Sequence, residues 1–292
     1  MIKNNKRSMV AVAGLMCMVF IAGCGGSDSS TSPSVSGKVA DGYLQNALVF
    51  LDRNLNYQLD DGEPSTRTDA SGAYTLDVDA EDIGLYPIVA VAIAGETIDM
   101  DAPAQTLTQS YVLCTPAAGV SGTVSNFISP MSTLLREKLE ATPGMTLTDA
   151  MIQLRNQMDL PVGMNLMGDY MLGSTSGQYQ NQYQAMHQTA QQMAGAMADQ
   201  AGLVMSGTGA NAPRFRAMMG EINQTMSQIA AGSADMGALR TRMQTRLNGV
   251  GITSGFGNYS SLFRNMTGHN SFWNYSGGIK QPRSGMMQMF SN

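Results

Sequence analysis

The chain has few of the residues on which most catalytic centres are built. Of its 292 residues only three are cysteine and two are histidine, His187 and His269. It contains no Gly-x-Ser-x-Gly nucleophile turn, no His-Glu-x-x-His zinc motif, no cysteine–histidine pairing signature and no glycine-rich loop that would cradle phosphate. We therefore expect a protein that is not an enzyme.

Charge is also scarce, and basic charge most of all. Charged residues make up 13% of the chain, with 17 Lys and Arg against 22 Asp and Glu. Beyond the first seven residues the basic side chains form no cluster, which argues against nucleic acid or anionic lipid as a partner. Two acidic groups stand out, and we expect them to be solvated strand ends and turns: Asp77, Asp79, Glu81 and Asp82, and Asp99 with Asp101.

The N-terminal segment has the composition of a targeting sequence. A basic start, made of Lys3, Lys6 and Arg7, is followed by an apolar run over residues 9–20. The run is shorter than the ~20 residues needed to cross a bilayer. It leads into Ile21-Ala-Gly-Cys24, which resembles the lipobox of bacterial lipoproteins. The resemblance implies that residues 1–23 are a signal peptide, removed before Cys24, and that Cys24 is lipidated.

The residues after Cys24 define the expected location. Gly25 occupies the position where a lipoprotein retained in the inner membrane carries Asp. The resemblance therefore implies an outer-membrane lipoprotein, on the periplasmic or the cell-surface face. Residues 24–34 are rich in Gly and Ser, which predicts a flexible tether between the membrane and the folded part.

The remaining cysteines agree with this processing. Cys17 would leave with the signal peptide and Cys24 would carry lipid, so only Cys114 remains and no intrachain disulfide can form. Cys114 lies in an apolar, strand-like run, and we expect a small buried hydrophobic residue.

Residues 52–63 have the ligand spacing of an EF-hand calcium loop. Oxygen-bearing side chains occupy the first, third, fifth, seventh, ninth and twelfth positions: Asp52, Asn54, Asn56, Gln58, Asp60 and Glu63. The sixth position, usually Gly, is Tyr57, and Asp61 adds another acid. Because these acids repel one another, we expect a calcium ion among them, bound in the weak range of about 10⁻⁴–10⁻³ M. Asp69, in the next turn, is a candidate to complete the shell. The alternative is a solvated acidic turn that binds no ion.

The region 35–118 is predicted to be β structure. Short alternating or apolar runs are separated by Gly, Asp and Pro turn signals at regular spacing, as in a small antiparallel sandwich. The runs are residues 35–40, 47–51, 73–78, 86–93, 97–100 and 106–113. The calcium loop would thus follow a strand rather than a helix.

Several of these runs together resemble a known module. Ser36-Gly-Lys-Val-Ala-Asp-Gly-Tyr-Leu44, the loop with its Gly62-Glu-Pro64 ending, and Thr68-Asp-Ala-Ser-Gly-Ala-Tyr74 are similar to the carboxypeptidase-regulatory-like or Cna-B (SdrD-B)-like module. That module is a prealbumin-type β-sandwich of secreted bacterial proteins and lipoproteins. The resemblance covers roughly residues 35–115. It implies a non-catalytic spacer or binding module, often loaded with calcium.

The region 119–250 is predicted to be helical. Ser129 followed by Pro130 is a good helix start, which predicts a helix over residues 130–140. Thr148 is the expected cap of a second helix over residues 149–158. From Gly177 onward apolar residues recur at steps of three and four, which predicts three further helices packed as a small bundle.

This helical half also contains nearly all of the methionines of the mature chain. A methionine stripe at helical spacing favours a packed core, although it also occurs in partner-binding grooves and thioethers suit Cu(I). The residues that would serve a copper site are Met164, Met167, Met171, Met266, His269 and Trp273. Residues 251–292 form a tail rich in Gly, Asn and aromatic residues, without a clear period.

The sequence therefore predicts an α+β protein of two domains, an N-terminal antiparallel β-sandwich followed by a Met-rich helical bundle. We expect a non-catalytic, calcium-stabilised binding or assembly module, held at the outer membrane by its lipid anchor, with an envelope protein or polysaccharide as partner. The first alternative is a periplasmic copper-binding protein. The second is an envelope enzyme that uses His187 or His269.

Overall fold

The computed structural model describes residues 33–250. The expected signal peptide, the lipidation site Cys24, most of the tether and the tail from 251 to 292 lie outside the described residues. Ser34, expected to end the tether, instead opens the first strand. The described residues form a mixed α+β structure.

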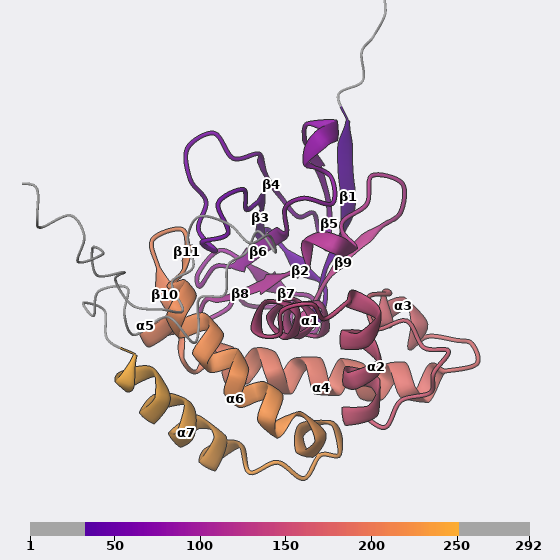
Figure 1. The fold of residues 1–292 in the computed structure, drawn as a ribbon, viewed down its shortest axis with the longest axis vertical. Helices are drawn as coiled ribbons and strands as arrows, with labels where there is room; N and C mark the ends of the chain where they lie inside the picture. Colours follow the sequence, from indigo (N-terminus) through magenta and orange to yellow (C-terminus); the bar gives the residue numbers. More distant parts are fainter. Residues whose placement is uncertain (1–32, 251–292) are drawn as a thin grey trace, which may run out of the picture. The chain divides into compact units, whose positions relative to one another are not determined.

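The strands form two main sheets and two short ribbons (Figure 1). The first sheet has the order β5 (Ala73–Asp77), β1 (Ser34–Val39), β9 (Asn126–Ile128). The second has the order β4 (Ser65–Arg67), β3 (Leu48–Leu51), β6 (Ile88–Ala92), β8 (Tyr111–Cys114). The ribbons pair β2 (Leu44–Gln45) with β7 (Ile98–Asp99), and β10 (Met205–Ser206) with β11 (Gly209–Ala210).

Most pairings are antiparallel, but β9 runs parallel to β1. This short strand lies beyond the expected end of the β region at residue 118, within the range 119–250 that was assigned to the helical domain. Gly37 of β1 allows the close approach, since a Cβ there would lie 1.8 Å from the carbonyl oxygen of Asn126. No side chain larger than hydrogen fits at that crossing.

The burial of each strand follows its sequence. β1 and β5 alternate between buried and more exposed residues, as expected for strands with one solvated face. β6 and β8 are continuous apolar runs and are buried throughout. Helices α1 and α4 pack against β8, which explains why the second sheet needs apolar residues on both faces.

The helices are α1 (Pro130–Ala141), α2 (Leu147–Gln157), α3 (Tyr170–Gly173), α4 (Gln180–Ala198), α5 (Ala201–Val204), α6 (Ala212–Ala230) and α7 (Met236–Gly249). Two 3₁₀ turns, Ala80–Asp82 and Ala117–Gly119, interrupt the loops of the β region. α1 starts as expected, with Ser129 as the cap and Pro130 in the first turn. The second helix starts earlier than expected because Thr146, rather than Thr148, forms a capping box with Asp149.

α1 is the central helix of the structure (Figure 1). It packs against β8 on one side and against α2, α4 and α6 on others, and every residue from Pro130 to Lys138 is buried. Its first turn is fixed to the second sheet, since Ser132 Oγ donates to the carbonyl of Cys114 at 2.7 Å and the Cys114 amide donates to Thr133 Oγ1 at 2.9 Å. Cys114 is a buried free thiol, as expected, and burial raises its pKa to about 12.

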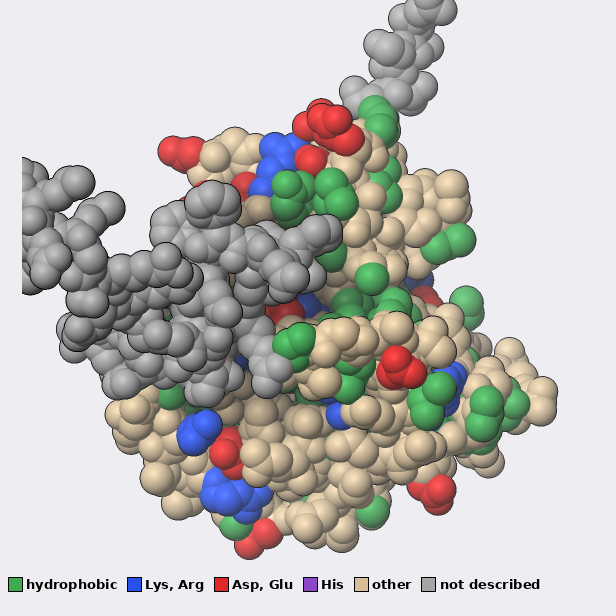
Figure 2. Space-filling view, in the orientation of Figure 1, with side chains coloured by type: hydrophobic (Ala, Val, Ile, Leu, Met, Phe, Trp, Pro, Cys, Tyr) green, Lys and Arg blue, Asp and Glu red, His purple; other side chains and the backbone are tan. Residues whose placement is uncertain are grey.

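The methionines of the long helices lie in the core. The side chains that are at most 1% exposed include Met186, Met193, Met197, Met218, Met219, Met226 and Met243. The outer faces of these helices carry polar side chains, and Figure 2 shows apolar side chains in small separate groups on the face in view. Among the described residues, none of the helices is both long and apolar enough to span a membrane.

The strands and helices share one continuous core and belong to one compact unit of contacts. The loop over residues 52–63 lies where β3 ends and before β4 begins, and it contacts α1 and α6 through the side chains described next.

Candidate functional site

The loop over residues 52–63 curls around its own polar side chains. Leu55 and Tyr57 have positive φ angles, 66° and 65°, which turn the backbone back on itself. The carboxylate of Asp52 accepts the amides of Asn56 at 2.9 Å and of Tyr57 at 3.2 Å. Tyr57 therefore adopts the left-handed conformation for which calcium loops usually use Gly.

Part of the expected ligand set converges. The side-chain amides of Asn54 and Asn56 both donate to Asp60 Oδ2, each at 2.6 Å. The Glu63 carboxylate accepts the amides of Arg53 at 2.7 Å and of Asp60 at 3.1 Å, which closes the loop. These contacts bring the side chains of Asn54, Asn56 and Asp60 to one point with Glu63 beside it, and the two asparagines face Asp60 with their NH₂ groups. Their side-chain oxygens accept backbone amides, that of Asn56 for Asn54 and that of Gln58 for Asn56.

Asp52 is directed away from that point, toward the helices. Its side chain is fully buried, and its Oδ2 lies 3.1 Å from Nη2 of Arg136 on α1. Arg136 is also buried, with 2% of its side chain exposed. The charge of Asp52 is thus balanced by a cation within the fold, so the expected mutual repulsion of the loop acids is smaller than the sequence suggests.

Tyr57 also joins the loop to the helices, and we call this contact region between the loop, α1 and α6 the junction. Its ring lies 3.9 Å from the Arg136 guanidinium and 4.9 Å from the ring of Phe215 on α6. Its hydroxyl donates to Glu137 at 2.5 Å and lies 3.1 Å from Glu140. Behind it, the Tyr57 carbonyl accepts the amide of Ala210 at 3.0 Å. The tyrosine at the sixth position therefore anchors the loop to α1, α6 and the β10–β11 ribbon.

The two acids of α1 in this junction, Glu137 and Glu140, have pKa values that are shifted in opposite directions. Burial, followed by repulsion from Glu140, raises the pKa of Glu137 to about 7. Burial alone would raise the pKa of Glu140 as well, but the guanidiniums of Arg136 and Arg216 lower it overall. Arg136 contacts Glu140 at 2.9 Å and Arg216 contacts it at 2.8 Å. Glu140 is therefore a carboxylate that forms ion pairs with two buried arginines.

The other predicted ligands lie elsewhere. Gln58 points toward Gly207 of the β10–β11 turn. Asp61 is exposed and has no hydrogen bond or ion pair within the described residues. Asp69 does not join the loop, because the β3–β4 register puts it beyond Arg67, at the opposite end of the hairpin. There its carboxylate accepts the amides of Ser71 and Ala73, as an Asx turn.

A metal ion in this loop would depend on amide oxygens. Within residues 33–250 no group of three or more His, Cys, Asp or Glu side chains is arranged to hold a metal ion. The residues that fit calcium best are Asn54, Asn56 and Asp60, with Glu63 adjacent, because each carries an oxygen of the kind that a hard cation prefers. The two asparagine oxygens now accept backbone amides, so they would have to rotate to reach an ion.

A second cluster of acids surrounds the turn after β1. Asp41 is 5% exposed, and its Oδ2 accepts the Tyr111 hydroxyl at 2.7 Å while its Oδ1 has no partner within the described residues. Asp99 and Asp101 approach the same turn so closely that a Cβ on Gly42 would lie within 2.6 Å of both carboxylates. Burial, followed by repulsion from Asp99, raises the pKa of Asp41 from 3.8 to about 7. Asp99, expected to be solvated, is thus partly buried in this acidic cluster, whereas Asp101 is exposed, as expected, and lies at its edge.

The residues that would serve the alternative functions are placed as follows. His187 on α4 lies 2.6 Å from Asp101, and its ring stacks on Tyr170 at 6.0 Å. Met164 is buried in the core, and Met167 packs against Gly119. Met266, His269 and Trp273 lie outside the described residues.

Sequence reasoning missed the residues of α1 and α6 that complete the junction: Arg136, Glu137, Glu140 and Arg216. A run of alternating charges is usually a solvated face of a helix, and only the apolar residues just before it, Met131, Leu134 and Leu135, indicate that α1 enters the core. No family model, curated protein or solved structure matches the chain.

Replacing Arg136 with Met should lower the free energy of unfolding by about 3–5 kcal/mol, because Asp52 then stays buried without its cation. Urea unfolding measures the loss. Arg240→Met is the matched control, since Arg240 forms an exposed pair with Asp199 and its loss should cost no more than about 1 kcal/mol. Equal losses in the two variants would show that the buried pair is no more important than a surface pair.

Asp41 should make the protein less stable as pH rises from about 4 to about 7. In that window the folded state retains a proton that the unfolded state has released, so stability falls by up to about 1.4 kcal/mol per pH unit. The Asp41→Asn variant, which can still accept from Tyr111, should lack this component in unfolding measured across the range. The exposed control Asp61→Asn should retain it, and identical pH profiles for Asp41→Asn and the parent chain would contradict the assignment.

Proposed function

We propose that the chain is a lipid-anchored protein of the bacterial cell envelope whose folded unit is a non-catalytic binding or assembly module stabilised by calcium. The observation that carries the calcium role is the grouping of the Asn54, Asn56 and Asp60 side chains within a loop of calcium-binding spacing. To bind an ion beside Asp60, the two asparagines would turn their side-chain oxygens toward it in place of their NH₂ groups. The lipobox ending in Cys24 supports the anchor and the outer-membrane location. An envelope protein or polysaccharide is the partner that fits this location.

In this proposal calcium stabilises the loop that connects the second sheet to the helices. Asn54, Asn56, Asp60 and Glu63 would hold the ion, which would neutralise the carboxylates of Asp60 and Glu63. Asp52 keeps its own cation, Arg136. Because Tyr57 of the same loop contacts α1 and α6, an ion held here would stabilise the helices as well as the strands.

The finer architecture belongs to the same proposal. We take the β5-β1-β9 and β4-β3-β6-β8 sheets as the two layers of a prealbumin-type sandwich, followed by a helical domain. Contacts between β4 and β5 and between β6 and β9, which link the two sheets, support a layered arrangement.

The alternatives have less support. For copper, the described methionine sulfurs have a simpler role, because the long helices use them to fill the core. For an enzyme, His187 has an acid partner in Asp101, but the described contacts bring no hydroxyl or thiol nucleophile to its ring. Neither arrangement supplies the set of groups that its chemistry needs.

Replacing Cys24 with Ser should move the protein from the membrane fraction to the soluble fraction of the envelope, since the acylated thiol is lost. Immunoblots of separated fractions and metabolic labelling with a palmitate analogue measure the change. Cys17→Ser makes the same chemical change seven residues earlier and should leave both results as in the parent chain. Palmitate labelling that persists in Cys24→Ser would rule out the anchor.

Calcium should raise the midpoint of thermal unfolding of the whole folded unit. At ten times the dissociation constant the expected stabilisation is about 1.4 kcal/mol, and a chelator should reverse it. Asp60→Asn should abolish the shift, whereas Asp61→Asn, a change of equal charge at an exposed position, should preserve much of it. No shift in the parent chain at millimolar calcium would remove calcium from the proposal.

A further inference from the structure

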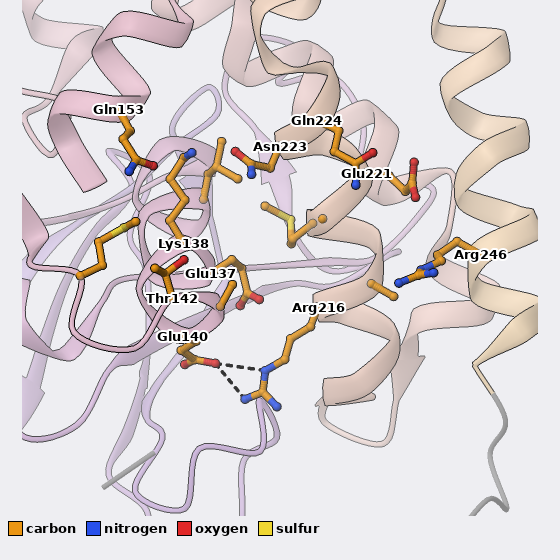
Figure 3. Close-up of a pocket in the computed structure, with 16 residues that line it drawn as sticks. Glu137, Lys138, Glu140, Thr142, Gln153, Arg216, Glu221, Asn223, Gln224 and Arg246 are labelled. Carbon is orange, nitrogen blue, oxygen red and sulfur yellow. Dashed lines mark hydrogen bonds and ion pairs between the residues drawn. The ribbon is translucent and has the colours of Figure 1, made fainter. Parts of the chain in front are cut away.

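A cavity of about 230 Å³ lies between α1, α2, α6 and α7 (Figure 3). It is separate from the loop over residues 52–63, although Glu137 and Glu140 of the junction form part of its wall. Its volume is below the roughly 300–1,000 Å³ of sites for drug-sized ligands, so any occupant is a small molecule.

Lys138 is the cation of this cavity that needs a partner. Only 7% of the residue is exposed, and within the described residues its amine makes no hydrogen bond or ion pair. In Figure 3 the side chain points into the cavity, on the side where Gln153 and Asn223 lie. Burial lowers the pKa of the amine, the effect expected for a cation that is partly withdrawn from water without a counter-ion.

The acids of the wall are already engaged. Glu140 is paired with Arg136 and Arg216, as the dashed lines of Figure 3 show for Arg216. Glu221 lies 3.6 Å from Arg242 of α7, and Glu137 accepts the Tyr57 hydroxyl. The charges left without a partner in the described structure are therefore positive, at Lys138 and at Arg246. The complementary ligand is an anion.

The other side chains of the cavity wall indicate which kind of anion fits best. Gln153, Asn223 and Gln224 offer side-chain amides, and Leu134, Met145 and Met219 add apolar surface. A carboxylate matches one lysine and neutral amide donors, and a short hydrocarbon portion matches the apolar wall. A phosphate dianion matches less well, because Glu137 and Glu140 lie in the same wall.

We propose that this cavity binds a small aliphatic carboxylic acid, with its carboxylate on Lys138 and the adjacent amides and its hydrocarbon portion on Met145 and Met219. Removing the charge of Lys138 should weaken binding at least tenfold. This binding site lies among the helices, and binding there does not depend on whether calcium occupies the loop.

The test uses the full chain with its lysines methylated by ¹³C-formaldehyde and a reducing agent, which keeps the charge of each amine and makes it visible by NMR. The probes are butyrate, succinate and inorganic phosphate at millimolar concentrations. We expect butyrate or succinate to shift the Lys138 signal in a saturable manner and to raise its pKa toward the ordinary value. Lys38, the other lysine of the described residues, should not respond.

Calorimetry on the unmethylated chain provides the second measurement. Lys138→Met should lose binding of the carboxylate, whereas Lys38→Met, the same change outside the cavity, should retain it. If Lys138→Met fails to fold, the NMR titration of the parent chain provides the test by itself. No saturable shift with either acid, equal shifts at Lys38 and Lys138, or tighter binding of phosphate than of both acids would each overturn the proposal.

Discussion

The buried pair of Asp52 and Arg136 connects two regions that are 84 residues apart in the chain. Taking both charges out of water is costly, and the cost is recovered only when each charge has its partner and its hydrogen bonds. Asp52 meets that condition with two loop amides and one guanidinium. Arg136 meets it in part, since it also contacts Glu140 and the face of Tyr57 while its Nη1 has no hydrogen-bond partner in the described structure. The loop, the end of β3 and the central helix α1 are consequently held in one arrangement.

This pair changes how the acidic loop should be understood. The loop balances one carboxylate with a cation from α1 and leaves Asp60 and Glu63 to be balanced by amides or by an ion. It also explains the tyrosine at the sixth position. The strain of a positive φ at a non-glycine residue is on the order of 1 kcal/mol, and it is offset because the Tyr57 ring packs between Arg136 and Phe215. A glycine there would leave the junction without its central ring.

Much of the local structure was predictable because local rules control it. The apolar runs at residues 47–51 and 73–78 became strands, Ser129 and Pro130 began α1, and the breaks near Gly207 and Gly232 ended helices. The pairing of β9 was not predictable, because three residues give no period and only the tertiary structure brings them beside β1. The charged residues of α1 were not identified as buried, because their partners Asp52, Tyr57 and Arg216 come from distant parts of the chain.

By itself the sequence determined the spacing of the loop oxygens, the basic and apolar N-terminal segment that precedes Cys24, the single cysteine of the β region and the alternation of strands and helices. These depend on neighbours within a few residues. Only the tertiary structure decided which loop side chains meet, why Asp69 lies apart from them, and that Lys138 faces a cavity without a counter-ion. The physical reason is that burial and charge pairing depend on which segments meet in space, and in this chain the decisive partners are separated by dozens of residues.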